Sequence, residues 1–227
     1  MPVCYQPNDR QRALPPATPR AELGLPERAL VLCGFNQPFK ISADVFDAWC
    51  SLLQRLPHAV LWLLEWNTQV RKNIEFEAVK RGIDTARIVW APKRQPAVHM
   101  ARLQQADLFI DTWPCNAHTT AGEALWVGVP VVTHIGATFA QRVAASLLHA
   151  VDLDELVSDD AAGYRERVLQ LAADPARRSR LRTQLLAQRA AFGRGHVLEC
   201  LAPFAKQRAA FGGRHVTQLL STLIRQP

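Results

Sequence analysis

The chain has 227 residues, of which 48% are hydrophobic and 21% are charged. These values are typical of one large globular domain with a tail, and they exclude a collagen-like chain and a highly charged disordered one. The formal net charge is +7, but the first 175 residues carry 17 basic and 19 acidic side chains, whereas residues 176–227 carry ten basic side chains and one acid.

The basic tail on a near-neutral body favours a solvated helix face or a docking surface over a nucleic-acid reader. No apolar run approaches the roughly 18 residues of a membrane span, and no basic start with an apolar core follows Met1. We therefore expect a cytoplasmic protein without membrane contact. The five cysteines form no C-x-x-C pair, and the seven histidines include no H-E-x-x-H motif. Reduced thiols and no metal site are expected.

The predicted elements begin after a proline-rich amino-terminal segment, residues 1–28, which we expect to be extended and without a folded element. Short apolar strands then alternate with helices, which is typical of βαβ crossovers and a parallel sheet covered on both faces. The predicted strands are 29–33, 60–64, 87–90, 108–111 and 130–133, and the predicted helices are 43–55, 74–81, 98–104, 119–126 and 140–148. The sequence thus predicts an α/β, doubly wound, Rossmann-like lobe over residues 29–155.

The helix predicted at 43–55 gives the clearest periodic signal. Its apolar side chains fall on one face, and they are Val45, Phe46, Trp49, Leu52 and Leu53. Ser42 can cap this helix, and Asp44 in the first turn suits the helix dipole.

Residues 156–227 are predicted to form carboxy-terminal helices and a basic tail. The helices are expected at 162–172 and 176–189, on either side of Asp174-Pro175. The sequence QRAAFGRGHV at 188–197 returns as QRAAFGGRHV at 207–216. Two copies do not make a solenoid, so we interpret the repeat as a local duplication.

Ligands of a doubly wound sheet bind beyond the carboxyl ends of its strands, so the loops there are expected to carry the binding residues. The loop after the first strand places the amide of Gln37 three residues before the ammonium of Lys40, although a lone exposed lysine would look the same. The loop at 112–120 ends at a helix start with His118, Thr119 and Thr120. Free N–H groups at that start make an anion site suited to a diphosphate.

Two further side chains could complete a nucleotide site. Glu123, one turn into the same helix, could accept hydrogen bonds from ribose hydroxyls, or it could be solvated. His99 could stack on a base, or it could be a partly buried histidine at a helix start. The chain contains no G-x-x-x-x-G-K-[ST] and no G-x-G-x-x-G, so the usual signals of ATP hydrolysis and dinucleotide binding are missing.

These loops occur within a series of motifs: F-N-Q-x-x-K-I, L-W-L-L, D-T-x-P-x-N-x-H-T-T, A-L-W-x-G-V-P-V-V-T and F-A-x-R-V-A-A-S-L-L. In this order they resemble the carboxy-terminal catalytic half of the O-linked N-acetylglucosamine transferase family, including its bacterial SPINDLY-like members. The likeness runs from about Tyr5 to about Arg189, and the long H-T-T motif makes it specific.

The resemblance implies the nucleotide-binding lobe of a two-lobed (GT-B) glycosyltransferase that uses UDP-N-acetylglucosamine for inverting transfer to Ser and Thr of proteins. It implies no cofactor and no metal, and a catalytic Lys40 that stabilises the leaving UDP. The residues that it implies are Gln37, Lys40, His118, Thr119 and Thr120 for the diphosphate, His99 for the uracil and Glu123 for the ribose.

The chain also departs from the family. Glu123 stands where the family usually has Asp, and the family's Ser-Pro-Leu-Phe-like stretch is absent after Arg189. The family places its other catalytic lobe and a helical-repeat region before this segment, so a separate lobe or repeat chain is an expected partner, beside the UDP-sugar donor and the acceptor protein. The alternative is a truncated, catalytically inactive nucleotide-sugar-binding module. A nucleic-acid-binding protein is favoured only by the charge of the tail.

Overall fold

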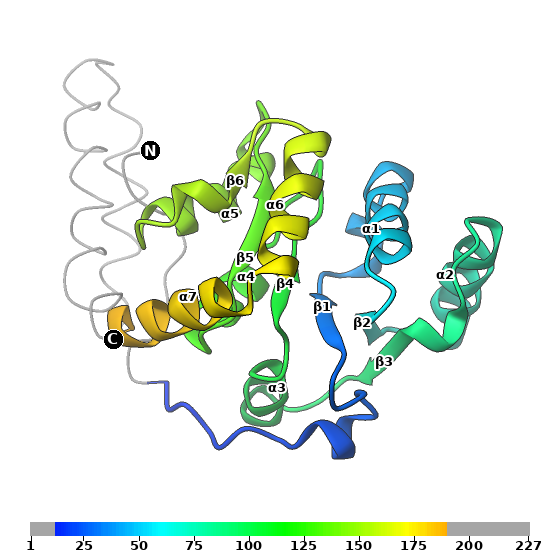
Figure 1. Cartoon of the computed structure of the whole chain (residues 1–227), viewed down its shortest axis with the longest axis horizontal. Helices are drawn as coiled ribbons and strands as arrows, with labels where there is room; N and C mark the ends of the chain where they lie inside the picture. The colour runs from blue at the N-terminus through cyan, green and yellow to red at the C-terminus, as the bar shows by residue number, and fades with distance from the viewer. Residues whose placement is uncertain (1–11, 190–227) are drawn as a thin grey trace, which may run out of the picture.

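The computed structural model describes residues 12–189, which form a parallel sheet covered by helices (Figure 1). The sheet has six strands in the order β3-β2-β1-β4-β5-β6, and every pair of neighbours is parallel. The strands are β1 (Leu30–Gly34), β2 (Ala59–Glu65), β3 (Ile88–Pro92), β4 (Leu108–Ile110), β5 (Val131–His134) and β6 (Val157–Ser158). The order reverses between β1 and β4, as in a doubly wound sheet. The predicted fold class is confirmed.

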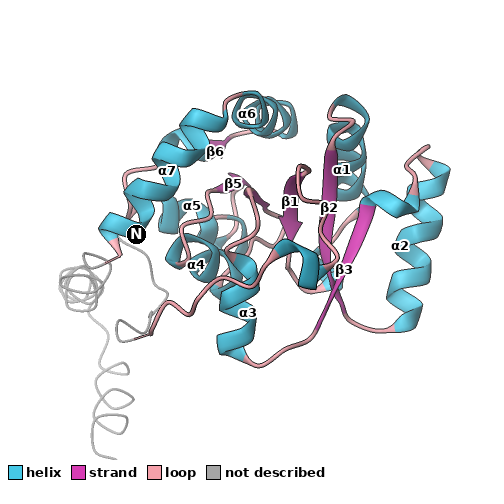
Figure 2. Cartoon of the chain, turned by 60° about the horizontal axis from the view of Figure 1, so that its bottom comes forward, coloured by secondary structure: helices cyan, strands magenta, loops and turns pink. Residues whose placement is uncertain are grey.

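Helices cover both faces of this sheet. The α-helices are α1 (Ala43–Arg55), α2 (Thr68–Lys80), α3 (Pro96–Leu103), α4 (Thr119–Trp126), α5 (Val143–His149), α6 (Ala161–Ala173) and α7 (Pro175–Gln188). Figure 2 shows α1 and α6 on one side of the sheet and α3 and α4 on the other. The short 3-10 helices are η1 (Arg20–Leu23), η2 (Pro38–Lys40), η3 (Thr85–Arg87), η4 (Phe139–Gln141) and η5 (Asp154–Leu156).

Helix α1 forms as its sequence predicts. The Ser42 side chain caps it by accepting a hydrogen bond from the Val45 N–H, and the whole predicted apolar face is buried. Trp49 packs so closely against the end of β1 that a Cβ atom at Gly34 would lie 2.8 Å from its ring. Gly34 therefore allows α1 to approach the sheet, which places the loop that follows β1 beside the loop that follows β4.

Helix α2 begins six residues before the predicted start at residue 74. Asn67 caps it, with its side chain accepting from the Val70 N–H at 2.9 Å. Only Ala78 of this helix is buried, so its first turns carry little of the apolar periodicity from which a helix can be predicted. Helix α3 also begins earlier than predicted, at Pro96 instead of residue 98. The helix predicted at 140–148 is divided into η4 and α5.

The sheet extends past residue 155, where the sequence predicts the end of the lobe. Strand β6 has two residues, too few for a pattern, and it pairs with β5 through Thr133 and His134. Helix α6 then packs against α1, with Tyr164, Val168 and Leu171 buried. The two helices predicted after residue 156 are therefore present, and α6 is part of the core.

The expectation that residues 1–28 hold no folded element is wrong for their described part. Residues 20–23 form η1, and Leu25 is buried. The Arg20 guanidinium anchors this segment, because it donates to the Ala29 carbonyl at 2.8 Å and to the Asp107 carboxylate at 2.9 Å. The duplicated sequence lies almost wholly outside the described residues. Within residues 12–189, no helix is long and apolar enough to cross a membrane, and no group of three potential metal ligands occurs.

Candidate functional site

The loops that follow β1 and β4 meet at the carboxyl edge of the sheet, where the strand order reverses. The Lys40 Nζ donates to the backbone oxygen of Asn116 at 2.7 Å, and the Ser42 hydroxyl donates to the backbone oxygen of Trp113 at 3.2 Å. Among residues 12–189, no carboxylate forms an ion pair with Lys40. The ammonium is therefore held in place by a neutral carbonyl, and its charge is not neutralised by an acid.

Helix α4 starts beside this ammonium. His118 is its N-cap residue, and neither Asp nor Glu stands in its first turn. Burial, and then the charge of Lys40, lower the pKa of His118, which favours a neutral imidazole. The structure thus brings Lys40 together with the helix start at His118, Thr119 and Thr120, as the sequence predicts. Gln37 is exposed in the same loop as Lys40.

His99 and Glu123 come together further along α4, as the predicted base-binding and ribose-binding residues should. The His99 Nε2 lies 3.7 Å from one oxygen of the Glu123 carboxylate. The other oxygen lies 3.4 Å from the Arg12 guanidinium. Burial raises the pKa of Glu123, and Arg12 opposes that rise. Arg12 is a site residue that sequence reasoning missed, since 111 residues separate it from Glu123.

Arg102 fixes the state of the His99 ring. Its guanidinium lies 3.0 Å from His99 Nδ1 and can only donate, so Nδ1 accepts and the ring proton is on Nε2, facing Glu123. Burial, and then the charge of Arg102, lower the pKa of His99 to about 4, so the imidazole is neutral at pH 7. The ring also lies against Phe35, with 5.4 Å between the ring centroids. His99 is therefore a neutral, oriented and partly buried ring.

A cavity of about 260 Å³ lies at the start of α3, and His99 is not among the residues that line it. Arg102 does line it, and this guanidinium also donates to the Pro92 carbonyl and lies over the Phe35 ring. The cavity is lined by Thr18, Glu22, Leu23, Trp62, Ala91, Pro92, Arg94, Val98 and Arg102. The nitrogens Trp62 Nε1 and Arg102 Nε are buried without a hydrogen-bond partner.

Asp111, directly after β4, was not among the predicted site residues. Its carboxylate accepts four hydrogen bonds. Asp111 is fully buried, and one carboxylate oxygen accepts from the Thr112 N–H at 2.7 Å and from the Ala117 N–H at 2.6 Å. The same oxygen accepts from Asn36 Nδ2 at 3.1 Å, and the other oxygen accepts from the Thr133 hydroxyl at 2.6 Å. Burial raises the pKa of Asp111 to about 6, against these hydrogen bonds, which lower it. The signal in the sequence that could have identified Asp111 is an acidic residue directly after a strand of apolar residues.

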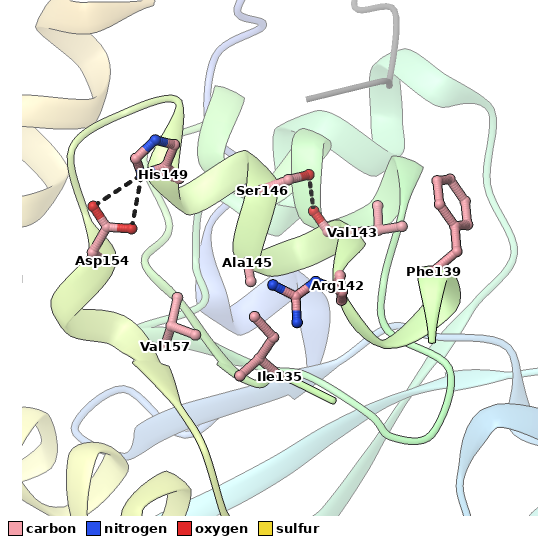
Figure 3. Close-up of a pocket in the computed structure, with 9 residues that line it drawn as sticks. All are labelled: Ile135, Phe139, Arg142, Val143, Ala145, Ser146, His149, Asp154 and Val157. Carbon is pink, nitrogen blue, oxygen red and sulfur yellow. Dashed lines mark hydrogen bonds and ion pairs between the residues drawn. The ribbon is translucent and has the colours of Figure 1, made fainter. Parts of the chain in front are cut away.

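A second pocket, of about 310 Å³, lies between η4, α5 and β6 (Figure 3). None of the predicted site residues lines it. Its polar side chains have partners within the protein: the Ser146 hydroxyl donates to the Val143 carbonyl at 2.7 Å, and His149 pairs with Asp154 at 3.1 Å (Figure 3). The predicted residues gather instead at the edge formed by β1, β4 and α4.

Comparison with known proteins identifies the family of this chain. The model of glycosyl transferase family 41 matches residues 8–195. A UDP-N-acetylglucosamine–peptide N-acetylglucosaminyltransferase of Caenorhabditis elegans is 36% identical over 77% of this chain and 15% of its own length. The probable transferase SEC of Arabidopsis thaliana is 32% identical over 83% of this chain and 20% of its own length.

Solved structures of other glycosyltransferases resemble this chain. A mutant O-GlcNAc transferase of Thermobaculum terrenum superposes with a TM-score of 0.68 and 32% identity, over 77% of this chain and 35% of that one. A sucrose-phosphate synthase of Thermosynechococcus elongatus superposes with a TM-score of 0.59 over 88% of this chain and 53% of that one, but at 17% identity it shows the fold alone. The chain spans a fifth or less of the length of the Caenorhabditis elegans and Arabidopsis thaliana relatives. Family model, relatives and fold agree that the chain belongs to glycosyltransferase family 41.

Proposed function

We propose that this chain is the nucleotide-sugar-binding lobe of a glycosyltransferase that uses UDP-N-acetylglucosamine and transfers the sugar, with inversion, to Ser and Thr of proteins. The names of the relatives support this donor and this class of acceptor. The observation on which the proposal most depends is the position of the Lys40 ammonium, held by the Asn116 carbonyl at the start of α4.

The diphosphate is proposed to bind between Lys40 and the first turn of α4. An ammonium has three N–H donors, and the bond to Asn116 uses one of them. Two donors and an unneutralised positive charge are left for phosphate oxygens. The N–H groups of a helix start add donors and a favourable dipole. Gln37 and Thr119 are proposed to contribute through their side chains, and Thr120, whose hydroxyl donates to Asn36, through the backbone of the helix start.

The nucleoside is proposed to bind at the other end of this edge. The neutral ring of His99 offers a face for the uracil, and the Glu123 carboxylate, 3.7 Å from that ring, offers acceptors for ribose hydroxyls. Glu123 already has Arg12 as a partner, so its charge stays compensated when a neutral sugar binds.

The chemical role of Lys40 follows from the charge that develops during transfer. When the bond from the sugar to the phosphate breaks, negative charge accumulates on the leaving UDP. A fixed ammonium and a helix start stabilise such charge without reorganisation, so we propose that no divalent cation is needed. The acceptor and the remaining catalytic groups are proposed to come from a further lobe, since the relatives are at least about five times longer than the matched segment.

Calorimetric titration of the 227-residue chain with UDP in the presence of EDTA tests this proposal. We expect binding with a Kd below the millimolar range, unchanged by added Mg²⁺, because the chain itself supplies the positive charge. UMP serves as the matched control ligand and should bind more weakly, because it lacks the second phosphate. No binding of UDP at millimolar concentration, or binding only with Mg²⁺, would contradict the proposal.

A further inference from the structure

The buried amide of Asn36 connects Asp111 with the first turn of α4. Its Nδ2 donates to Asp111 at 3.1 Å, and its Oδ1 accepts from the Thr120 hydroxyl at 2.8 Å. The Asp111 oxygen in this contact already accepts from two backbone N–H groups, so it presents lone pairs only. Asn36 must therefore turn its NH₂ group toward Asp111 and its carbonyl toward Thr120.

This orientation decides where the proton of the Thr120 hydroxyl lies. A hydroxyl has a single proton, and here it points inward to Asn36. The outward side of that oxygen then offers lone pairs, which do not bind a phosphate oxygen. A phosphate at this position therefore depends on the Lys40 ammonium and on the dipole of the helix start rather than on the Thr120 hydroxyl.

Asp111 also holds the loop that precedes α4. Its carboxylate accepts from the Ala117 N–H, next to the Asn116 carbonyl that binds Lys40 and next to the N-cap residue His118. The buried Asn116 amide closes the same loop by donating to the Thr112 carbonyl at 2.8 Å. One carboxylate thus accepts a hydrogen bond from the residue that lies between the helix start and the carbonyl that holds the ammonium.

Burying a carboxylate away from water is costly unless its oxygens are hydrogen-bonded. Asp111 recovers that cost through four donors, and three of them, from Asn36, Thr112 and Ala117, lie in the two site loops. An apolar residue at the end of β4 could fill the same volume, but it would leave these donors without an acceptor. The presence of a carboxylate at this buried position is therefore explained by the donors of the two site loops, which need an acceptor.

We propose that Asp111 is a positioning residue of the donor site: through the Ala117 N–H and through Asn36 it fixes the start of α4 and the Lys40 ammonium for the diphosphate. This inference rests on the proposed function, and it concerns the phosphate end of the site only. Within residues 12–189, the Asp111 carboxylate accepts its hydrogen bonds from Asn36, Thr112, Ala117 and Thr133 and not from His99 or Glu123 at the nucleoside end. The two ends can therefore be tested separately.

The test compares UDP with uridine on Asp111→Ala, Asp111→Asn and Ser158→Ala. Asp111→Ala should weaken UDP binding about ten-fold or more, because several hydrogen bonds that place the phosphate donors are lost. Uridine affinity should stay within about two-fold. Asp111→Asn keeps an oxygen for the same three donors and should restore most of the UDP affinity. Ser158→Ala is the matched control, because it removes a buried hydrogen bond from the same sheet, to the Thr133 carbonyl, without touching the site loops.

Two results would overturn the inference. If Asp111→Ala loses UDP affinity and uridine affinity equally, Asp111 has a merely structural role. If Asp111→Ala binds UDP as tightly as the wild type does, Asp111 does not position the phosphate donors. If Asp111→Ala does not fold, Asn36→Ala takes its place with the same expected selectivity for UDP.

Hydrogen exchange of the ligand-free protein separates this inference from the proposed function. The Ala117 amide, bonded to Asp111, and the Gly122 amide, bonded to His118, should be protected in the wild type and in Ser158→Ala. Both should exchange faster in the Asp111 and Asn36 alanine variants. If wild-type protein fails to bind UDP, the proposed function fails, but faster exchange would still support the positioning role, and unchanged exchange would overturn it.

Discussion

Lys40 provides the sharpest test at the scale of single residues. Lys40→Ala should weaken UDP binding by about ten-fold to a hundred-fold, because a charge-assisted bond to phosphate contributes about 1.5 to 3 kcal/mol. Uridine, which has no phosphate, should bind as it does to the wild type. Calorimetry with both ligands measures how much UDP affinity and how much uridine affinity the variant loses.

Two control variants sharpen that measurement. Lys93→Ala removes the same charge from a lysine that lies over the Trp66 ring, and it should leave both affinities unchanged. His99→Ala should lower the affinity for UDP and uridine alike. Equal losses of UDP and uridine affinity in Lys40→Ala would mean that Lys40 does not bind phosphate.

The candidate site could be predicted from the sequence only in part, and the reason is physical. Lys40, His118, Thr119 and Thr120 could be found because loops after parallel strands share one edge, a rule that needs only the strand assignments. Arg12 and Asp111 were missed because their roles depend on contacts across long stretches of chain. Arg12 meets Glu123 across 111 residues, and Asp111 meets Asn36 across 75.

At the scale of elements, the packing of α6 against α1 has a direct test. The Trp49 Nε1 donates to the Tyr164 hydroxyl at 3.1 Å, and that hydroxyl donates to the Asp111 carbonyl at 3.1 Å. Tyr164→Phe leaves the buried Trp49 N–H without an acceptor, so it should lower the free energy of unfolding by about 1–3 kcal/mol. Urea denaturation of the variant and the wild type measures this difference.

Gln170→Ala, on the exposed side of the same helix, provides the comparison. Its side chain donates to the Glu166 carboxylate at the surface, and the substitution should change the free energy of unfolding by less than about 0.5 kcal/mol. A Tyr164→Phe variant as stable as Gln170→Ala would show that α6 is not bound into the core as described.

The elements also show which parts of the fold a sequence pattern can predict. Helix α1 was predicted to the residue because one face is wholly apolar and its start carries a clear cap and an acid in the first turn. The start of α2 was not, because its first turns are solvent-exposed and only the Asn67 cap marks them. Strand β6 is too short for any alternation to show, and it is fixed by its pairing with β5. Tertiary contacts decide such elements.

At the scale of the whole molecule, the sheet presents one continuous edge on which phosphate and nucleoside ends are separated. Lys40 and the start of α4 lie at one end, and His99 with Glu123 at the other. The pocket of Figure 3 is built from other residues, around Arg142 and the His149–Asp154 pair. These are two separate places where a ligand could bind, and the proposed function requires the first.

The most direct measurement is therefore a titration of the isotope-labelled chain with UDP-N-acetylglucosamine, in EDTA, followed by amide chemical shifts. We predict that the largest changes fall on residues 36–40, on the start of α3 around His99 and on residues 117–123, with saturation as ligand is added. Shifts that gather instead around Ile135 and His149, or no shifts at millimolar ligand, would contradict the claim that the edge formed by β1, β4 and α4 binds the donor.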